Sequence, residues 1–113
     1  MELLAVSRER GIAVVAPAVK RLDASIAPAF RQAVLQLVEA GDTRLALDLA
    51  GLEFLDSSGL GAMVAVLKAL GSSGALVVCG LHGAVQSLFQ LTRMDKVFVI
   101  VPGRDEAVTR LAG

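Results

Sequence analysis

The sequence predicts an α/β fold: one small domain with a mixed sheet of four to five strands and about four helices. Short apolar segments typical of strands alternate with longer segments typical of helices along the 113-residue chain. Such alternation favours parallel strands joined by right-handed crossovers. The first two strand-like segments are separated only by the turn Arg8-Glu9-Arg10-Gly11, where Gly11 can adopt a positive φ, so an antiparallel hairpin should open the sheet. Because we find no repeat or linker, we expect a single domain over residues 1–113.

The strand predictions rest on short runs of β-branched and other apolar residues that are bounded by turn residues. Five segments have this character: Leu3–Ser7, Ile12–Pro17, Arg44–Ala50, Leu76–Cys79 and Val97–Val101.

The helix predictions rest on apolar periodicity and on residues that favour helix ends. The first helix is predicted over Ala27–Ala40, because Pro28 suits a first turn and Gly41 suits the C-terminal end. The second begins after Ser57 and ends near the turn Gly71-Ser72-Ser73-Gly74. The third and fourth are predicted over Ala84–Leu91 and Glu106–Leu111.

The motif Asp56-Ser57-Ser58-Gly59-Leu60-Gly61 lies where a strand-like segment gives way to the second helix. A helix start leaves backbone N–H groups without partners, and one side-chain oxygen suffices to cap it. Asp56, Ser57 and Ser58 compete for that role, so at least one hydroxyl is expected to be spare. Local chemistry alone favours a simple cap, since polar caps open most helices. The alternative is a serine that carries a phosphate, which the helix dipole and free N–H groups would favour.

The second helix is apolar nearly all round, with only Lys68 charged between Ser57 and Thr92. A helix of this kind is either covered on several sides or presents an apolar patch to a partner. Both interpretations remain open from the sequence. Under the second, the small residues Gly59 and Gly61 would let another backbone approach closely.

The motif Phe54-Leu55-Asp56-Ser57-Ser58-Gly59-Leu60-Gly61, with Leu76–Leu81 and Ala84–Phe89 after it, resembles the STAS family and in particular the bacterial anti-sigma factor antagonists. The resemblance extends from Leu22-Asp23 to Phe98 and so covers most of the chain. It implies a small STAS-like domain in which Ser57, the first hydroxyl residue after the aspartate, is phosphorylated. It also implies that Asp23 lies in a loop that engages the kinase, although Asp23 also suits a cap or dipole partner of the first helix.

The resemblance further implies a partner-switching cycle. The unphosphorylated domain would bind an anti-sigma factor that is also a serine kinase and so release a sigma factor, and a phosphatase would reverse the phosphorylation. Asp56 would shape the loop and cap the helix. The expected partner-binding residues are the following: Asp23, Asp56, Ser58, Gly59, Leu60, Gly61 and Met63. Two alternatives are a STAS accessory subunit of a transporter or stress-sensing complex, and a small ligand-binding α/β domain.

The chain departs from the family pattern at three places. Lys20-Arg21 reverses the usual charge before Leu22-Asp23, Arg93-Met94 stands where Gly-Leu is common, and Gly83 stands where a proline is common. These differences bear on the identity of the partner and not on the fold.

Catalytic and metal-binding functions find little support in the sequence. The only histidine, His82, is expected in a solvent-facing loop, and no Ser-His-acid arrangement is evident. Cys79 and His82 have metal-ligand spacing but no second pair, whereas structural zinc sites use four ligands. We therefore expect a binding protein with no catalytic residues, no metal and no cofactor.

Charge and composition exclude further classes. Lys and Arg total 11 and Asp and Glu total 11, so the basic field needed for direct nucleic-acid binding is absent. Hydrophobic residues make up 55% of the chain, but glycines and serines interrupt the longest uncharged stretch before it reaches the roughly 20 apolar residues of a membrane span. The single cysteine suits a reducing compartment. We expect a cytoplasmic protein without membrane insertion.

Overall fold

Five strands form the central sheet in the computed structural model, which describes residues 2–113. Their order across the sheet is β1-β2-β4-β6-β7, and only the β1–β2 pair is antiparallel. The bounds are β1 Leu4–Glu9, β2 Ile12–Pro17, β4 Arg44–Asp48, β6 Ala75–Cys79 and β7 Val99–Val101. The mixed α/β class and the opening hairpin are therefore confirmed.

The hairpin turns through two residues with positive φ, Arg10 at 55° and Gly11 at 79°. Two consecutive positive φ values are typical of the tight turn whose twist matches that of the flanking strands. The pairing of Glu9 with Ile12 shows that the first strand continues two residues beyond the predicted Leu3–Ser7.

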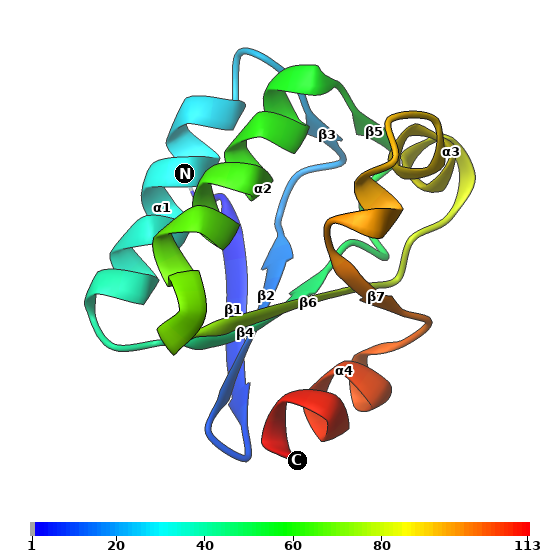
Figure 1. Ribbon diagram of the computed structural model, residues 1–113. Helices are drawn as coiled ribbons and strands as arrows, with labels where there is room; N and C mark the ends of the chain where they lie inside the picture. The colour runs from blue at the N-terminus through cyan, green and yellow to red at the C-terminus, as the bar shows by residue number, and fades with distance from the viewer. Residues whose placement is uncertain (1) are drawn as a thin grey trace.

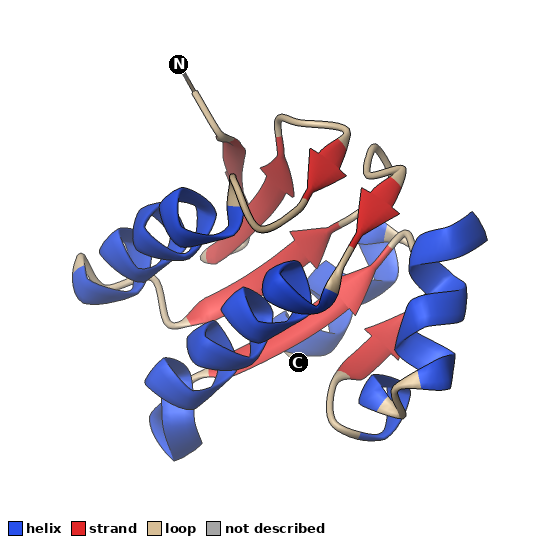
Figure 2. Cartoon of the chain, turned by 90° about the horizontal axis from the view of Figure 1, so that it is seen from above, coloured by secondary structure: helices blue, strands red, loops and turns tan. Residues whose placement is uncertain are grey.

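Helices cover both faces of the sheet (Figures 1 and 2). On one face, α1 (Ala27–Glu39) and α2 (Ser57–Leu70) lie side by side, and α3 (Gly83–Leu91) continues this layer. On the other face, α4 (Arg104–Ala112) packs alone against β2, β4 and β6. Two short 3₁₀ turns, Gly71–Ser73 and Met94–Lys96, follow α2 and α3.

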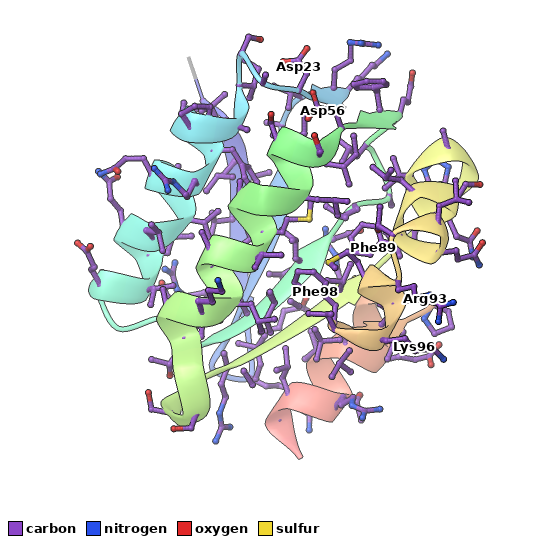
Figure 3. The ribbon with its side chains drawn as sticks, turned by 45° about the horizontal axis from the view of Figure 1, so that its top comes forward. Asp23, Asp56, Phe89, Arg93, Lys96 and Phe98 are labelled. Atoms are coloured by element: carbon purple, nitrogen blue, oxygen red, sulfur yellow. The ribbon has the colours of Figure 1, made fainter. Side chains whose placement is uncertain are left out.

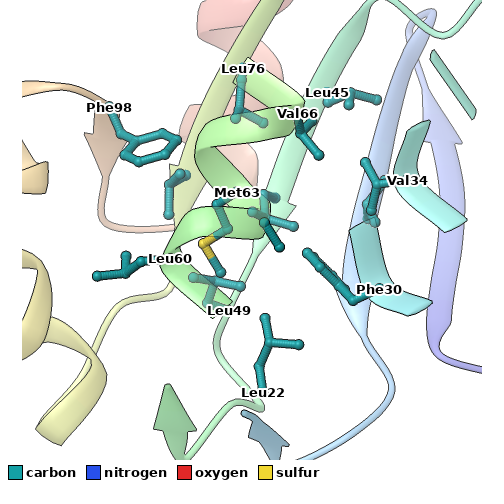
Figure 4. Packing of buried hydrophobic residues seen from close by; sticks show 14 of the residues in the cluster. Leu22, Phe30, Val34, Leu45, Leu49, Leu60, Met63, Val66, Leu76 and Phe98 are labelled. Atoms are coloured by element: carbon teal, nitrogen blue, oxygen red, sulfur yellow. The ribbon is translucent and has the colours of Figure 1, made fainter. Parts of the chain in front are cut away.

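The larger core lies between the sheet and the helices α1, α2 and α3. Met63 of α2, Phe30 of α1 and Leu22 are fully or almost fully buried in it (Figure 4). Phe89 and Phe98 pack edge to face, with ring centroids 5.8 Å apart, an arrangement that the aromatic quadrupoles favour. A smaller core forms under α4 around Ile12 and Val108.

Two short strands that the sequence analysis did not predict position the start of α2. β3 (Arg21–Leu22) and β5 (Phe54–Leu55) pair in parallel as a separate two-stranded sheet. Leu22 and Leu55 point into the larger core, whereas Arg21 is exposed, with its guanidinium carbon 4.0 Å from the centre of the Phe54 ring. β5 runs directly into Asp56 and α2.

The remaining predicted bounds differ by small amounts. The fourth helix begins at Arg104, two residues before the predicted Glu106, and the last strand begins at Val99 instead of Val97. Val97 and Phe98 instead close the preceding 3₁₀ turn through hydrogen bonds from their N–H groups to the Met94 carbonyl. The turn Gly71–Ser73, expected as a loop, is a single 3₁₀ turn.

Candidate functional site

Asp56 organises the start of α2. Its backbone is extended, with φ −112° and ψ −174°, and its Oδ1 accepts a hydrogen bond from the Gly59 N–H at 3.0 Å. Its Oδ2 accepts a second hydrogen bond from the Ala24 N–H at 3.1 Å. The predicted capping role of Asp56 is confirmed, and the carboxylate also holds the loop before α1 against α2. Figure 3 shows Asp56 and Asp23 at the same end of the molecule.

Ser57 and Ser58 occupy the first two positions of α2, and both are exposed. Within residues 2–113, neither hydroxyl makes a hydrogen bond, since the cap is supplied by Asp56. Within α2, Asp56 accepts the N–H of Gly59, so the N–H groups of Ser57 and Ser58 are not capped by it. Two spare hydroxyls therefore stand beside uncapped N–H groups at the positive end of a helix dipole, a favourable place for a phosphate.

Gly59 is buried where α2 passes closest to β3 and β5. A Cβ at this position would lie 2.3 Å from Leu55 Cδ1 and 2.7 Å from the Leu22 carbonyl oxygen. The second contact is with backbone, which cannot move aside cheaply. The glycine is thus needed for packing of the helix start within the domain, and its buried side offers no surface to a partner.

Two residues expected in the partner-binding surface point into the core instead. Met63 is 0% exposed and Leu60 is 6% exposed, so the expectation that their side chains contact a partner is wrong. They belong to the stripe of α2 that packs on the sheet, together with Val66. Gly61, by contrast, is exposed, with open space where a Cβ would lie.

The sequence left open whether α2 is buried or serves as a partner surface. The structure shows that one side of α2 is buried and the other is exposed. Leu60, Met63, Val66 and Leu70 are buried. The outer side carries Ser57, Gly61 and Lys68, with Val64 partly exposed. Small side chains on that outer side explain why the helix appeared apolar all round.

Asp23 forms a local turn and does not cap α1. Its Oδ1 accepts hydrogen bonds from the Ser25 hydroxyl at 2.6 Å and from the Ser25 N–H at 3.0 Å. The hydrogen bond from the hydroxyl is the largest cause that lowers the pKa of Asp23, and the nearby Arg21 guanidinium adds to it. The N-cap position of α1 is Ile26, without a side-chain hydrogen bond, so the capping interpretation of Asp23 is wrong. Its predicted role toward a kinase stays a prediction.

An open groove of about 240 Å³ runs between the first turns of α1 and α2. Small residues line most of it, and one cation and one hydroxyl complete it. The lining residues are the following: Ala24, Ala27, Pro28, Arg31, Ser58, Gly61 and Ala62. Sequence reasoning placed Ser58 and Gly61 in the site but missed Ala24, Pro28 and Arg31, because nothing in the sequence indicates which side of α1 faces the start of α2.

The groove distinguishes the two serines. Ser58 lines it, whereas Ser57 is not among the lining residues. Consecutive helical residues differ in direction by about 100° because a turn holds 3.6 residues. Ser57 is therefore exposed in a different direction from Ser58, whereas Gly61 is one of the residues that line the groove.

The single histidine does not assemble a catalytic group. His82 is exposed, and its Nε2 lies 2.8 Å from the Ala50 carbonyl oxygen. Within residues 2–113, no cluster of three or more His, Cys, Asp or Glu residues has the arrangement of a metal site.

Cys79 is fully buried, and desolvation raises the pKa of its thiol to about 11. No helix in the described part of the chain has the length and hydropathy needed to cross a bilayer.

Comparison with known proteins identifies the family. A sequence profile of the STAS domain matches residues 5–107, and the chain therefore belongs to the STAS domain family. Over 71 residues it is 32% identical to BtrV of Bordetella bronchiseptica, a protein named as a candidate anti-sigma factor antagonist. That match covers 62% of this chain, and the chain spans 61% of the length of this curated relative.

Solved structures agree with this assignment. An anti-sigma factor antagonist from Mycobacterium paratuberculosis matches with a TM-score of 0.89 and 31% identity, over 97% of this chain and 93% of that one. The Bacillus cell fate determinant SpoIIAA in its phosphorylated form matches with a TM-score of 0.70 and 19% identity, over 96% of this chain and 98% of that one. At this lower identity the second similarity shows the fold alone.

Proposed function

We propose that the protein is an anti-sigma factor antagonist that acts by binding and not by catalysis. Its unphosphorylated form binds an anti-sigma factor that is also a serine kinase, and so releases a sigma factor. Phosphorylation of Ser57 by that kinase ends the interaction, and a phosphatase restores it. Membership of the STAS family and the similarity to the antagonist from Mycobacterium paratuberculosis support this function.

One observation carries the assignment of the modified residue. Ser57 is the exposed first residue of α2, and its hydroxyl is spared from capping because the Asp56 carboxylate accepts the Gly59 N–H. The side chain is thus accessible to a kinase, and its modification removes no hydrogen bond of the folded domain. Ser58 is also exposed, but it lines the groove between α1 and α2, whereas Ser57 does not.

The phosphate would act on the interface and not on the fold. A phosphoserine carries about −1.5 to −2 charges near neutral pH, and an anion at an exposed helix N-terminus is favourable by about 0.3–1 kcal/mol. At an interface, the same dianion would have to lose its water against an apolar surface beside Asp56. An unpaired buried charge there costs on the order of 2–5 kcal/mol, which reduces affinity by about 30-fold to several thousandfold.

The test combines a modification assay with a binding assay. The protein is incubated with ATP and kinase-like anti-sigma factors encoded in the same genome, and intact mass is recorded. We expect one added phosphate on the wild type and on Ser58→Ala, and none on Ser57→Ala. Mapping of the phosphate to Ser58, Ser72 or Ser73 would contradict the assignment. If no anti-sigma factor bound the unmodified protein in calorimetry, the proposed function itself would be wrong.

A further inference from the structure

Two arginines near the start of α2 form no ion pair within residues 2–113. Arg21 lies on β3 beside the start of α2, and Arg31 lies on α1 and lines the groove that Ser58 also lines. Both are exposed. Within residues 2–113, the two ion pairs are formed by other arginines, Arg8 with Asp42 and Arg104 with Asp48.

The acidic groups at this end of the molecule are already engaged by backbone. Asp56 accepts N–H groups from Gly59 and Ala24, and Asp23 accepts the N–H and hydroxyl of Ser25. Each carboxylate therefore has its charge partly satisfied within the domain, although Asp23 still feels the charge of Arg21.

A third exposed cation, Lys20, precedes Arg21 in the chain. Its backbone carbonyl accepts the Glu53 N–H at 2.8 Å, and within residues 2–113 its ammonium group forms no ion pair. Arg21 and Arg31 differ from Lys20 in that Arg21 is stacked on Phe54 and Arg31 lines the groove.

Arg21 is held in a defined position. Its guanidinium carbon lies 4.0 Å from the centre of the Phe54 ring, and stacking of this kind fixes the planar group and leaves its edge N–H groups free for a carboxylate. Phe54 belongs to β5, which continues into Asp56. The stacked guanidinium is thus part of the rigid frame that presents Ser57.

Arg31 is placed differently, at a groove of small residues. Ala27, Gly61 and Ala62 leave room for one apolar side chain of a partner, and the guanidinium at the edge of the groove can pair with an acid next to that side chain. Arg21 thus lies by β5, the strand that leads into the serine pair, and Arg31 lies on α1 at the groove that Ser58 lines.

We propose that the partner of this face presents an acidic surface, with carboxylates that pair with Arg21 and Arg31 around an apolar side chain seated in the groove. The proposal rests on the proposed function, because it names the chemistry of the anti-sigma factor surface that docks here. It makes the two arginines specificity-determining residues: a partner with a basic docking surface is repelled, since like charges placed opposite each other disfavour the wrong complex.

The test measures binding of the cognate anti-sigma factor to the unphosphorylated full chain by calorimetry at several salt concentrations. We expect Arg21→Gln/Arg31→Gln to lower affinity by about three- to thirtyfold, as two exposed charge contacts would. We also expect the salt dependence of binding to become shallower, because screening weakens only charge–charge contacts. The matched control Lys96→Gln/Arg110→Gln removes two exposed cations away from the groove and should change neither quantity.

A charge-reversed variant makes the result decisive. For Arg21→Glu/Arg31→Glu, binding should weaken further, and added salt should now strengthen it, because salt screens the new repulsion. Melting temperatures are recorded for every variant to show that each is folded. If the wild type binds but the double glutamine variant matches it in affinity and salt dependence, the acidic-partner proposal is overturned while the proposed function stands. If the wild type binds no anti-sigma factor, both are overturned.

Discussion

The carboxylate of Asp56 accepts a hydrogen bond from the backbone N–H of Ala24 at 3.1 Å, across 32 positions of sequence. The same carboxylate caps α2 through Gly59. One side chain thereby fixes the position of the loop before α1 relative to the first turn of α2. The groove between the two helices depends on this relation, because Ala24 forms one wall and Ser58 the other.

Replacement of Asp56 tests that relation. Asp56→Ala should lower the free energy of unfolding by about 0.5–2 kcal/mol, the range for loss of an N-cap, and should speed amide hydrogen exchange at both Ala24 and Gly59. Asp56→Asn keeps one acceptor oxygen and should cost less. Faster exchange at Gly59 with no change at Ala24 would show that the cap forms without the link to the loop.

The two glycines of the motif predict opposite responses to alanine. Gly59→Ala places a methyl group 2.7 Å from the Leu22 carbonyl and should destabilise the domain by about 1–3 kcal/mol, as overpacking does. Gly61→Ala meets nothing within 4 Å and should stabilise by up to about 1 kcal/mol, because alanine favours a helix more than glycine. Chemical denaturation measures both. Equal effects of the two substitutions would contradict the packing described for Gly59.

Phosphorylation at Ser57 should leave the domain folded. The phosphate replaces a hydroxyl without hydrogen bonds and lies at the N-terminus of α2, so the melting temperature should stay the same or rise slightly. The measurement compares melting and far-UV circular dichroism of the modified and unmodified protein, with Ser57→Asp as an approximate mimic. A much lower melting temperature would mean that the switch acts through unfolding and not through the interface.

The lowered pKa of Asp23 predicts a specific pH dependence of the stability of the domain. The hydrogen bond from Ser25 lowers the pKa of Asp23 in the folded state, so this carboxylate contributes stability that is present above its unfolded pKa, about 3.9, and is lost as pH falls through the lower folded pKa. Asp23→Asn should therefore lower stability slightly near pH 7 and reduce the loss of stability in acid by the same amount. Both changes should be small, since the group is exposed. A pH series of denaturation curves checks this, and identical acid dependence would contradict it.

A separate measurement addresses the kinase-facing role predicted for Asp23. Asp23→Ala should slow phosphorylation or weaken partner binding while melting stays nearly unchanged, with Ser25→Ala as the control that removes the same hydrogen bond but keeps the charge. Loss of activity in both variants alike would assign the effect to the turn and not to the carboxylate.

Cys79 should be unreactive in the native protein. Complete burial raises the pKa of its thiol to about 11, mainly through desolvation, and the thiolate is the reactive form. At pH 8, a thiol reagent should modify Cys79 only at the rate of opening of the domain, and fully in denaturant. Rapid labelling without denaturant would show that β6 opens locally.

The sequence predicted the strands and helices that show apolar periodicity or that end at a residue typical of a turn or a helix terminus. The main strands and α1 were found because several residues show the same periodicity. β3 and β5 were missed because two residues are too few to show any. Leu60 and Met63 were expected on the partner-binding surface because of the family resemblance, and the small residues on the outer side of α2 left the direction of its apolar face open. The burial of both side chains in the larger core shows that direction.

Asp23 shows a different limit. An aspartate ahead of a helix suggests a cap, yet the chain makes one more turn before α1 begins. The carbonyl oxygen of Asp23 accepts N–H groups from Ile26 and Ala27, which are the contacts of a preceding turn. Arg31 was not predicted in the site because its relation to Ser58 depends on how two helices pack, which is a property of tertiary structure.

The separate core under α4 has a practical consequence. Val108 and Ala107 are buried on the face of the sheet opposite to α1 and α2. Substitutions there should change the stability of the folded domain without disturbing the geometry around Ser57. A series of graded substitutions at Val108 would yield proteins that share one docking face but survive for different times before they unfold. Under the proposed function, such a series would show how much of a sigma-factor response depends on the lifetime of the folded domain, independently of how tightly it binds its partner.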